Sequence, residues 1–463
     1  MRRTLIILSL LACCGTAAAQ QYSFTFQPAG LEDTMLYIGR HYRDEVQLLD
    51  STRPATKGYL FAGKRTWQRG VYALVRQDRK TVLTDFLIDD SRVFTLSGDN
   101  KMSATSVKVK GSKANIAMFD YMATQQRAVK EADSLKKAGD KAGLEALSTR
   151  MIAYEDSALA NGKNNIYLHL IDVCQNPKVP DDVTDKALYY RTHYWDRLFE
   201  SDYRTTDPIL VYSPQFFNKM NYFFFGLLYR ADSDTINAEF DRLMNRIGDD
   251  TAMVRYIIQF FEPKYYRSSA KNVGWDAVWC HIASEYILKN RCPWMRESEV
   301  FLARQNYNRI RQSLIGAHGQ ELMMLDTTQI DAPEHWFSSH RFPEKYVILW
   351  FWDPDCHHCQ EQSAELKILY DSLQNAPDRR FEIYAVGYES DVAKWKKYVR
   401  EHDFRWVNVG GPNVNIDYQE AYNIHSAPTM IILNEKRDII MNKTLPAKSL
   451  LKFLDNYEKT TKH

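Results

Sequence analysis

Two cysteines that follow closely on a continuous apolar run constrain the fold more than any other feature of the chain. The apolar run occupies residues 346–352 (YVILWFW), and the cysteines are Cys356 and Cys359. An unbroken apolar run of this length is typical of a strand that is buried on both faces of a sheet. From about Cys356 to Leu373 apolar residues recur at helical spacing, so the cysteine pair is expected at the start of a helix. This region is therefore predicted to be α/β.

The same alternation continues to the end of the chain. Periodicity predicts further strands at 381–387, 406–409, 429–433 and 438–441. It predicts further helices at 392–399 and 447–458. The last two strands are expected to pair as a hairpin.

The cysteine pair carries the chemistry that the sequence suggests. The positive potential of a helix N-terminus favours a thiolate, so Cys356 is expected to be the exposed nucleophile and Cys359 the resolving thiol. A zinc site is the alternative, but a tetrahedral site needs two more ligands, and the chain has no second pair with metal-binding spacing. We therefore expect no metal and no cofactor.

A second motif lies downstream of the pair, at 426–429 (SAPT). Together with 351–356 (FWDPDC) and 394–397 (KWKK), it gives the chain from Phe342 onward a resemblance to the thioredoxin superfamily. The resemblance is specifically to exported TlpA/ResA-type thiol–disulfide oxidoreductases. It implies a thioredoxin fold for residues 325–463.

The resemblance also implies roles for single residues. Cys356 would attack, Cys359 would resolve, and Pro428 would follow a cis peptide bond in a loop opposite the pair. Trp352 and Ala427 would contact the substrate, which is expected to be a cysteine-containing protein. A membrane or periplasmic thiol partner would exchange electrons with the pair.

Three positions depart from the family pattern. Trp350 stands where thioredoxins carry a buried acid, and Gln362 stands where TlpA/ResA-type proteins often carry a glutamate. The usual bases for the resolving thiol are therefore missing, and Glu361 or Glu365 could replace them only if the helix turns them inward.

The third departure is the dipeptide His357-His358 between the cysteines. Histidines here can stabilise the Cys356 thiolate by charge and hydrogen bonding. Stabilising the reduced form makes the disulfide more oxidising, whereas Asp353 and Asp355 oppose this effect as nearby anions. We predict a reduction potential above that of thioredoxin.

The preceding residues show two further patterns. Residues 20–110 alternate as strands and predict a small antiparallel β-sandwich, and 111–324 predict an all-α domain with a break near Gly139 and Gly143. Aromatic stripes in the helical part could line a haem or lipid pocket, but their spacing is that of a helical core. The order of these domains resembles a multi-domain group of envelope proteins, a resemblance that gives architecture but no activity.

The N-terminus reads as an export signal. Residues 1–19 combine Arg2 and Arg3, a short apolar run and three alanines, so we expect cleavage before Gln20 and a periplasmic or cell-envelope location. Lipidation at Cys13 is the alternative, favoured less because a leucine stands at an atypical position. Disulfides persist outside the cytoplasm, and Cys280 and Cys292 could be bonded there or remain free.

Composition narrows the class of function. The formal net charge is only +2, and no basic run suggests nucleic-acid binding. The leading hypothesis is an envelope thiol–disulfide oxidoreductase. A non-catalytic binding or scaffold protein that uses the β and helical domains is the alternative. A thiol peroxidase is weaker, because it would require a threonine at the position of Asp353.

Overall fold

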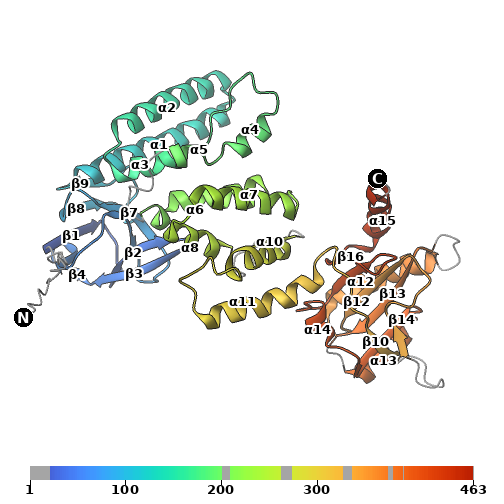
Figure 1. Ribbon diagram of the computed structural model, residues 1–463. Helices are drawn as coiled ribbons and strands as arrows, with labels where there is room; N and C mark the ends of the chain where they lie inside the picture. The colour runs from blue at the N-terminus through green and yellow to red at the C-terminus, as the bar shows by residue number, and fades with distance from the viewer. Residues whose placement is uncertain are drawn as a thin grey trace, which may run out of the picture. The chain divides into compact units, whose positions relative to one another are not determined.

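The computed structural model describes residues 21–200, 209–261, 274–326, 336–373, 379–388 and 391–461. The predicted signal segment, 1–19, lies outside the described residues. The chain forms two compact units, and each is considered by itself (Figure 1). The first holds the described residues up to Leu228 together with Arg246–Tyr256, and the second holds Tyr229–Asn245 and the described residues from Ile257 onward. Within the described ranges, no helix is both long and apolar enough to cross a membrane.

The first unit begins with two sheets. Their strands are β1 (Gln21–Pro28), β2 (Leu36–Tyr42), β3 (Glu45–Thr52), β4 (Pro54–Ala55), β5 (Gly58–Lys64), β6 (Gly70–Val75), β7 (Val82–Ile88), β8 (Val93–Gly98) and β9 (Lys108–Lys110). One sheet has the order β4-β5-β1-β8-β9, and the other has the order β3-β2-β6-β7. Aromatic rings join the sheets, because Phe24 and Phe26 of the first lie 6.3 and 5.0 Å from Phe86 of the second. This core makes the predicted sandwich.

One pairing in the sandwich corrects the all-antiparallel expectation. β1 pairs with β8 in parallel, in the register Phe24↔Phe94 and Phe26↔Leu96. Parallel neighbours need a long connection, and here the chain between them forms the strands from β2 to β7. Alternation along a strand reports which face is buried but not the direction of its neighbour, so the sequence could not show this pairing.

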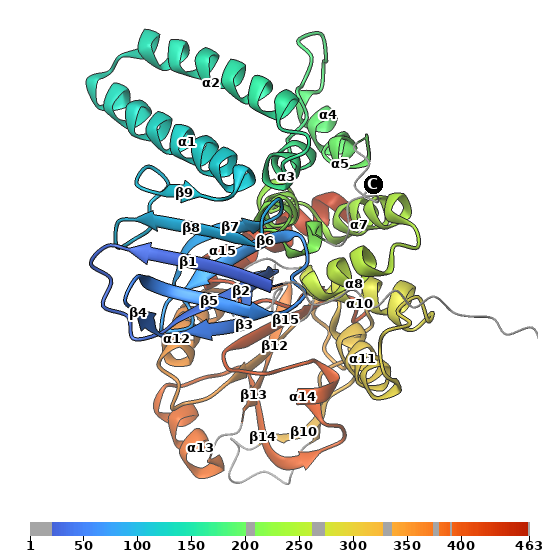
Figure 2. The ribbon, with the colours of Figure 1, turned by 90° about the vertical axis from the view of Figure 1, so that its left-hand side faces the viewer.

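Helices complete the first unit. The hairpin predicted around Gly139 consists of α1 (Lys113–Ala138) and α2 (Lys141–Asn161), which lie side by side in Figure 2. Gly139 ends α1 with a φ of 70°, a left-handed conformation that glycine adopts without a steric penalty. The following helices are α3 (Ile166–Val173), α4 (Lys186–Thr192), α5 (Asp196–Glu200), η1 (Leu210–Tyr212), α6 (Pro214–Asn221) and η2 (Tyr222–Leu227).

The aromatic stripes of this helical part form a core, as their spacing predicted. Trp195, Phe216, Phe223 and Phe224 are all buried. Further along the chain lie α7 (Ser233–Ile247), α8 (Thr251–Phe260), α10 (Trp275–Ile282), η3 (Ala283–Ile287), α11 (Glu297–Ile310) and η4 (Arg311–Ser313).

The second unit contains a seven-stranded sheet with the order β11-β10-β14-β13-β12-β15-β16. Its strands are β10 (Met323–Asp326), β11 (Trp336–Ser338), β12 (Tyr346–Trp352), β13 (Phe381–Gly387), β14 (Val407–Val414), β15 (Thr429–Leu433) and β16 (Ile439–Met441). β12 lies inside the sheet, parallel to β13 and antiparallel to β15. All seven residues of β12 are buried, as the apolar run predicted.

Two apolar cores cover the faces of this sheet. One contains Trp350, Cys359 and Leu366, together with side chains of α12 (His357–Leu373), α13 (Val392–Glu401) and α15 (Ala447–Thr461). The other lies against the opposite face and includes residues of α14 (Tyr418–Ala421) and the segment that follows it. This is the α/β arrangement that the sequence predicted.

Candidate active site

Cys356 lies immediately before the first residue of α12, at the end of the turn that follows β12. Its carbonyl oxygen accepts the hydrogen bond of the Gln360 N–H at 3.0 Å, which begins the helix. Its Sγ accepts the N–H of Cys359 at 3.3 Å. Cys356 therefore occupies the N-cap position, where a side-chain acceptor satisfies a helix N–H that would otherwise lack a partner.

Cys359 lies one turn further in and is fully buried in the core between β12 and α12. Burial and, to a smaller extent, the hydrogen bond with Cys356 together raise the pKa of its thiol to about 12. The partly exposed Cys356 and the buried Cys359 therefore have the unequal surroundings that an attacking and a resolving thiol require.

The loop before β15 faces Cys356. The Ala427–Pro428 peptide bond is cis, as the resemblance implied. The thiol of Cys356 donates to the Ala427 carbonyl oxygen at 3.8 Å, and Thr444 Oγ1 donates to the Pro428 carbonyl oxygen at 3.0 Å. The structure thus brings Cys356, Cys359 and the Ala427–Pro428 loop together from distant parts of the sequence.

Trp352 does not have the surface that a substrate contact needs. Its side chain is fully buried and packs against Trp395, Tyr398 and Phe404, with ring centroids 6.3, 5.6 and 5.6 Å away. The expectation of direct substrate binding is therefore corrected. Trp352 ends β12, where every position is buried, so its indole supports the turn from inside the core.

His357 and His358 both point towards Glu361. His357 Nε2 lies 3.2 Å from Glu361 Oε1, and His358 Nδ1 lies 3.4 Å from Glu361 Oε2. The two side chains are 79% and 82% exposed. Each imidazole therefore has a carboxylate partner in solvent, and their effect on the Cys356 sulfur stays a prediction.

Thioredoxins and TlpA/ResA-type proteins often carry acidic side chains at two positions where this chain has Trp350 and Gln362. Trp350 is buried and donates from Nε1 to Ser363 Oγ at 3.0 Å. Gln362 Oε1 is buried and has no hydrogen-bond partner among the described residues. Glu361 and Glu365 are exposed, so α12 does not turn either of them inward as a substitute base.

A charge pair beside the cysteines was missed by the sequence analysis. Lys394 of α13 binds the Asp355 carboxylate, which stands next to Cys356. This contact offsets one of the two anions that we expected to oppose the thiolate. Asp353 keeps its local role in the turn, where its carboxylate accepts the Asp355 N–H at 2.7 Å and its carbonyl accepts the Cys356 N–H at 3.1 Å. Lys394 lies far from Asp355 in the sequence, so the sequence analysis noted it only as part of the motif at 394–397.

The other described cysteines are separate from this site. Cys174, Cys280 and Cys292 are all unbonded, so Cys280 and Cys292 take the free-thiol alternative in the structure. Burial raises the pKa of Cys280 to about 12 and that of Cys292 to about 11. In the part of the chain that the structure describes, no group of three or more histidine, cysteine or acidic side chains could hold a metal ion.

Comparison with known proteins identifies the fold of the second unit. A family model described as thioredoxin-like matches residues 344–439. A thioredoxin-like protein from Bacteroides caccae is 16% identical, with a TM-score of 0.47, and the match covers 61% of this chain and 98% of that one. A domain of a possible thiol-disulfide isomerase from Cytophaga hutchinsonii is 29% identical, with a TM-score of 0.28, and the match covers 32% and 96% of the two chains.

The thioredoxin domain of a thiol-disulfide oxidoreductase from Bacteroides vulgatus is 22% identical, with a TM-score of 0.26, and the match covers 31% of this chain and 96% of that one. No curated protein matches the chain. The C-terminal region is therefore a thioredoxin-like domain, and it follows a β-rich region and a helical region.

Proposed function

We propose that the protein is a thiol–disulfide oxidoreductase that exchanges disulfides with protein thiols through Cys356 and Cys359. The observation that carries the proposal is the position of the Cys356 sulfur. It lies at a helix N-terminus, between the Cys359 N–H at 3.3 Å and the Ala427 carbonyl at 3.8 Å. The helix terminus favours the thiolate by its partial positive charge, and the facing loop offers backbone groups to an extended substrate.

In the reductive direction, the Cys356 thiolate attacks one sulfur of a substrate disulfide. A mixed disulfide forms, and the other substrate sulfur leaves as a thiolate that takes up a proton. The Cys359 sulfur, once deprotonated, then attacks the Cys356 sulfur. The substrate leaves with two thiols, and the protein keeps a Cys356–Cys359 disulfide, so two electrons have moved to the substrate. The reverse sequence oxidises a substrate.

The cellular setting is part of the same proposal. A periplasmic or envelope location, after removal of residues 1–19 or with lipidation at Cys13, would give the pair access to disulfides that persist outside the cytoplasm. Its substrates would be cysteine-containing envelope proteins, and a membrane or periplasmic thiol protein would reset the pair. Mass spectrometry of the protein isolated from its host would show the mature N-terminus directly.

The test combines catalysis with trapping. The full chain should catalyse the reduction of insulin by dithiothreitol, and Cys356→Ser should abolish the catalysis. Cys359→Ser should accumulate mixed disulfides on Cys356, which can be identified by mass spectrometry. Cys292→Ser is a matched control, because it removes a buried thiol elsewhere in the second unit. An inactive wild-type chain and an empty Cys359→Ser trap would refute the proposal and favour a scaffold.

A further inference from the structure

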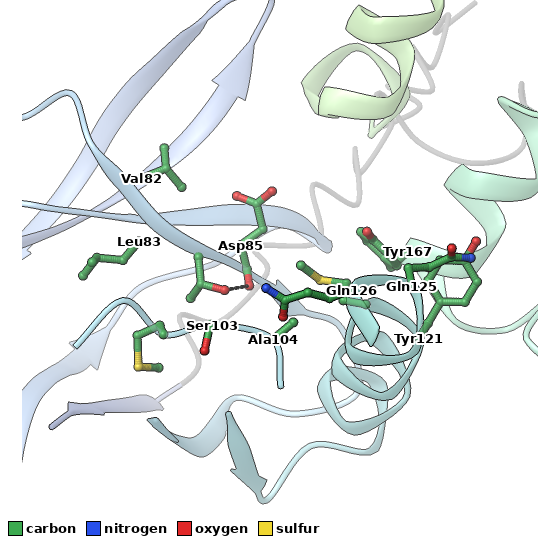
Figure 3. Close-up of a pocket in the computed structure, with 12 residues that line it drawn as sticks. Val82, Leu83, Asp85, Ser103, Ala104, Tyr121, Gln125, Gln126 and Tyr167 are labelled. Atoms are coloured by element: carbon green, nitrogen blue, oxygen red, sulfur yellow. Dashed lines mark hydrogen bonds between the residues drawn. The ribbon is translucent and has the colours of Figure 1, made fainter. Parts of the chain in front are cut away.

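A groove of about 490 Å³ lies in the first unit, between the outer edge of β7 and the side of α1. Figure 3 shows Leu83 and Asp85 on the strand side and Gln125 and Gln126 on the helix side. Ala104 lies in the loop that borders the groove. β7 is the last strand in the order β3-β2-β6-β7, so none of the described strands pairs with one of its edges.

The hydrogen bonds of Leu87 show which peptide groups of β7 face this edge. Its N–H donates to Asn115 Oδ1 at 2.7 Å, and its carbonyl accepts from Asn115 Nδ2 at 2.8 Å. The N–H and C=O of one residue in an antiparallel ladder point to the same side, and alternate residues point to alternate sides. Asp85 therefore presents its backbone groups to the same outer edge as Leu87. The Asn115 amide takes the place of a partner strand at Leu87 only.

Val82 presents its backbone groups to this edge as well. The Arg76 N–H donates to the Thr81 carbonyl at 2.9 Å, so the next pair, Val75↔Val82, is a non-bonded pair whose peptide groups point away from each other. The register then shifts between Val75↔Val82 and Leu74↔Thr84, and Leu83 is the extra residue of this irregularity. The Asp85 carbonyl oxygen accepts a hydrogen bond from the Thr84 hydroxyl at 3.2 Å, and the second lone pair of this oxygen remains available.

The rest of the groove supplies amide groups without a net charge. Gln126 Oε1 is buried and has no hydrogen-bond partner in the described structure. The Asp85 carboxylate is already paired with His41 Nε2 at 2.7 Å. Tyr167 closes one end, and no lysine or arginine lines the groove. A ligand here would therefore meet open backbone and amide dipoles and no cationic side chain that could hold an anion.

We propose that this groove binds an extended, uncharged polypeptide segment that adds to β7 as a strand. An edge strand beside a helix is the geometry in which main-chain hydrogen bonds supply affinity and side-chain pockets supply selectivity. Val82 and Asp85 lie opposite Val75 and Ala73 of β6, which are two residues apart, so at about 3.4 Å per residue their open groups match two alternate residues of the incoming segment. The site is separate from the cysteine pair and goes beyond the proposed redox function.

The test uses the full chain with Cys356→Ser and Cys359→Ser, so that thiol exchange cannot contribute. The probe is a fluorescein-labelled, amidated Thr-Val-Thr-Val-Thr peptide, and its partner probe carries N-methyl groups at both valines. Fluorescence anisotropy should show binding of the first peptide and at least tenfold weaker binding of the second. Hydrogen exchange of the Val82 and Asp85 amides should slow only with the first.

Two variants examine the groove itself. Ala104→Trp should fill it and weaken binding at least tenfold, whereas Ala55→Trp, at an exposed position of β4, should not. Gln126→Leu keeps the size of the buried side chain but removes its amide, and should weaken binding if Ala104→Trp fails to fold. Equal binding of the two peptides, or no binding of either, would overturn the proposal. So would slowing of exchange at Val82 and Asp85 by the disaccharide chitobiose and not by peptide.

Discussion

The two sulfurs of the pair differ in how readily each can lose its proton. Cys356 is partly exposed at a helix start, whereas burial raises the pKa of Cys359 to about 12. Near neutral pH the buried thiol is almost entirely protonated. As long as the pH is below this pKa, each increase of one pH unit raises the thiolate fraction about tenfold. The family's usual base is absent, because Gln362 fills its position and is neutral. Resolution by Cys359 should therefore limit turnover near pH 7.

Gln362→Glu should change the pH dependence of that step. For the wild type, we expect the rate at which Cys359 resolves a mixed disulfide to rise steadily between pH 6 and pH 9. A carboxylate at position 362 can accept the proton, so the variant should be about 100-fold faster at pH 7, at the lower end of ordinary general-base effects, and its profile should be flatter. Stopped-flow measurement with a preformed mixed disulfide would show both the faster rate and the flatter pH profile.

Glu361→Gln is the matched control for this change. It alters an exposed carboxylate on the same helix without touching the interior position. A wild-type profile that is already flat would mean that another group deprotonates Cys359, and the role given to position 362 would be withdrawn.

The histidines between the cysteines should tune the potential only modestly. Replacing both with glutamine removes groups that can stabilise the reduced form, so the reduction potential should fall. Both rings are about four-fifths exposed and paired with Glu361, and exposed charge pairs are weakened by solvent. We expect a decrease of about 30 mV or less, a tenfold change in equilibrium constant for a two-electron couple. Equilibration with glutathione measures the reduction potential of the cysteine pair. An increase in this potential would contradict the effect predicted for the histidines.

At the scale of single elements, the sequence predicted those parts whose pattern is local. The buried runs at 346–352 and 381–387 became β12 and β13, and the helix expected from about Cys356 became α12. The parallel pairing of β1 with β8 depends on long-range contacts that no local period encodes. Trp352 was misjudged for a different reason. Its substrate role was taken from the resemblance, whereas the apolar run had already placed it in a strand expected to be buried on both faces.

Asn115 should be the most sensitive polar residue where α1 meets β7. It is fully buried and satisfies both backbone groups of Leu87. Asn115→Leu would leave an N–H and a carbonyl buried without partners, which should cost about 2–6 kcal/mol at about 1–3 kcal/mol for each group. Hydrogen exchange of the Leu87 amide should accelerate accordingly.

Thr124→Ala provides the comparison on the same helix. Its hydroxyl bonds only the preceding turn, at Asp120, so the loss should stay within about 0.5 kcal/mol. Equal effects of the two changes would show that Asn115 does not hold the strand edge.

On the scale of the whole molecule, the two proposals place a thiol-exchange pair in one unit and a strand-adding groove in the other. A polypeptide held at the groove is tethered to the same molecule as Cys356, and tethering raises the effective concentration of the second encounter whenever the linking chain can span the two sites. Ala104→Trp should therefore raise the KM for reduction of a disulfide-containing unfolded polypeptide several-fold while leaving kcat unchanged. Reduction of a small disulfide, such as that of glutathione, should be unaffected, because it has no extended segment that could add to β7. Steady-state kinetics of Ala104→Trp with both substrates, with Ala55→Trp as the control, separates the contribution of the groove from that of the cysteine pair. Equal changes for the large and the small substrate would show that the substitution disturbs the cysteine pair itself, and unchanged kinetics for both would show that the groove does not serve the exchange reaction.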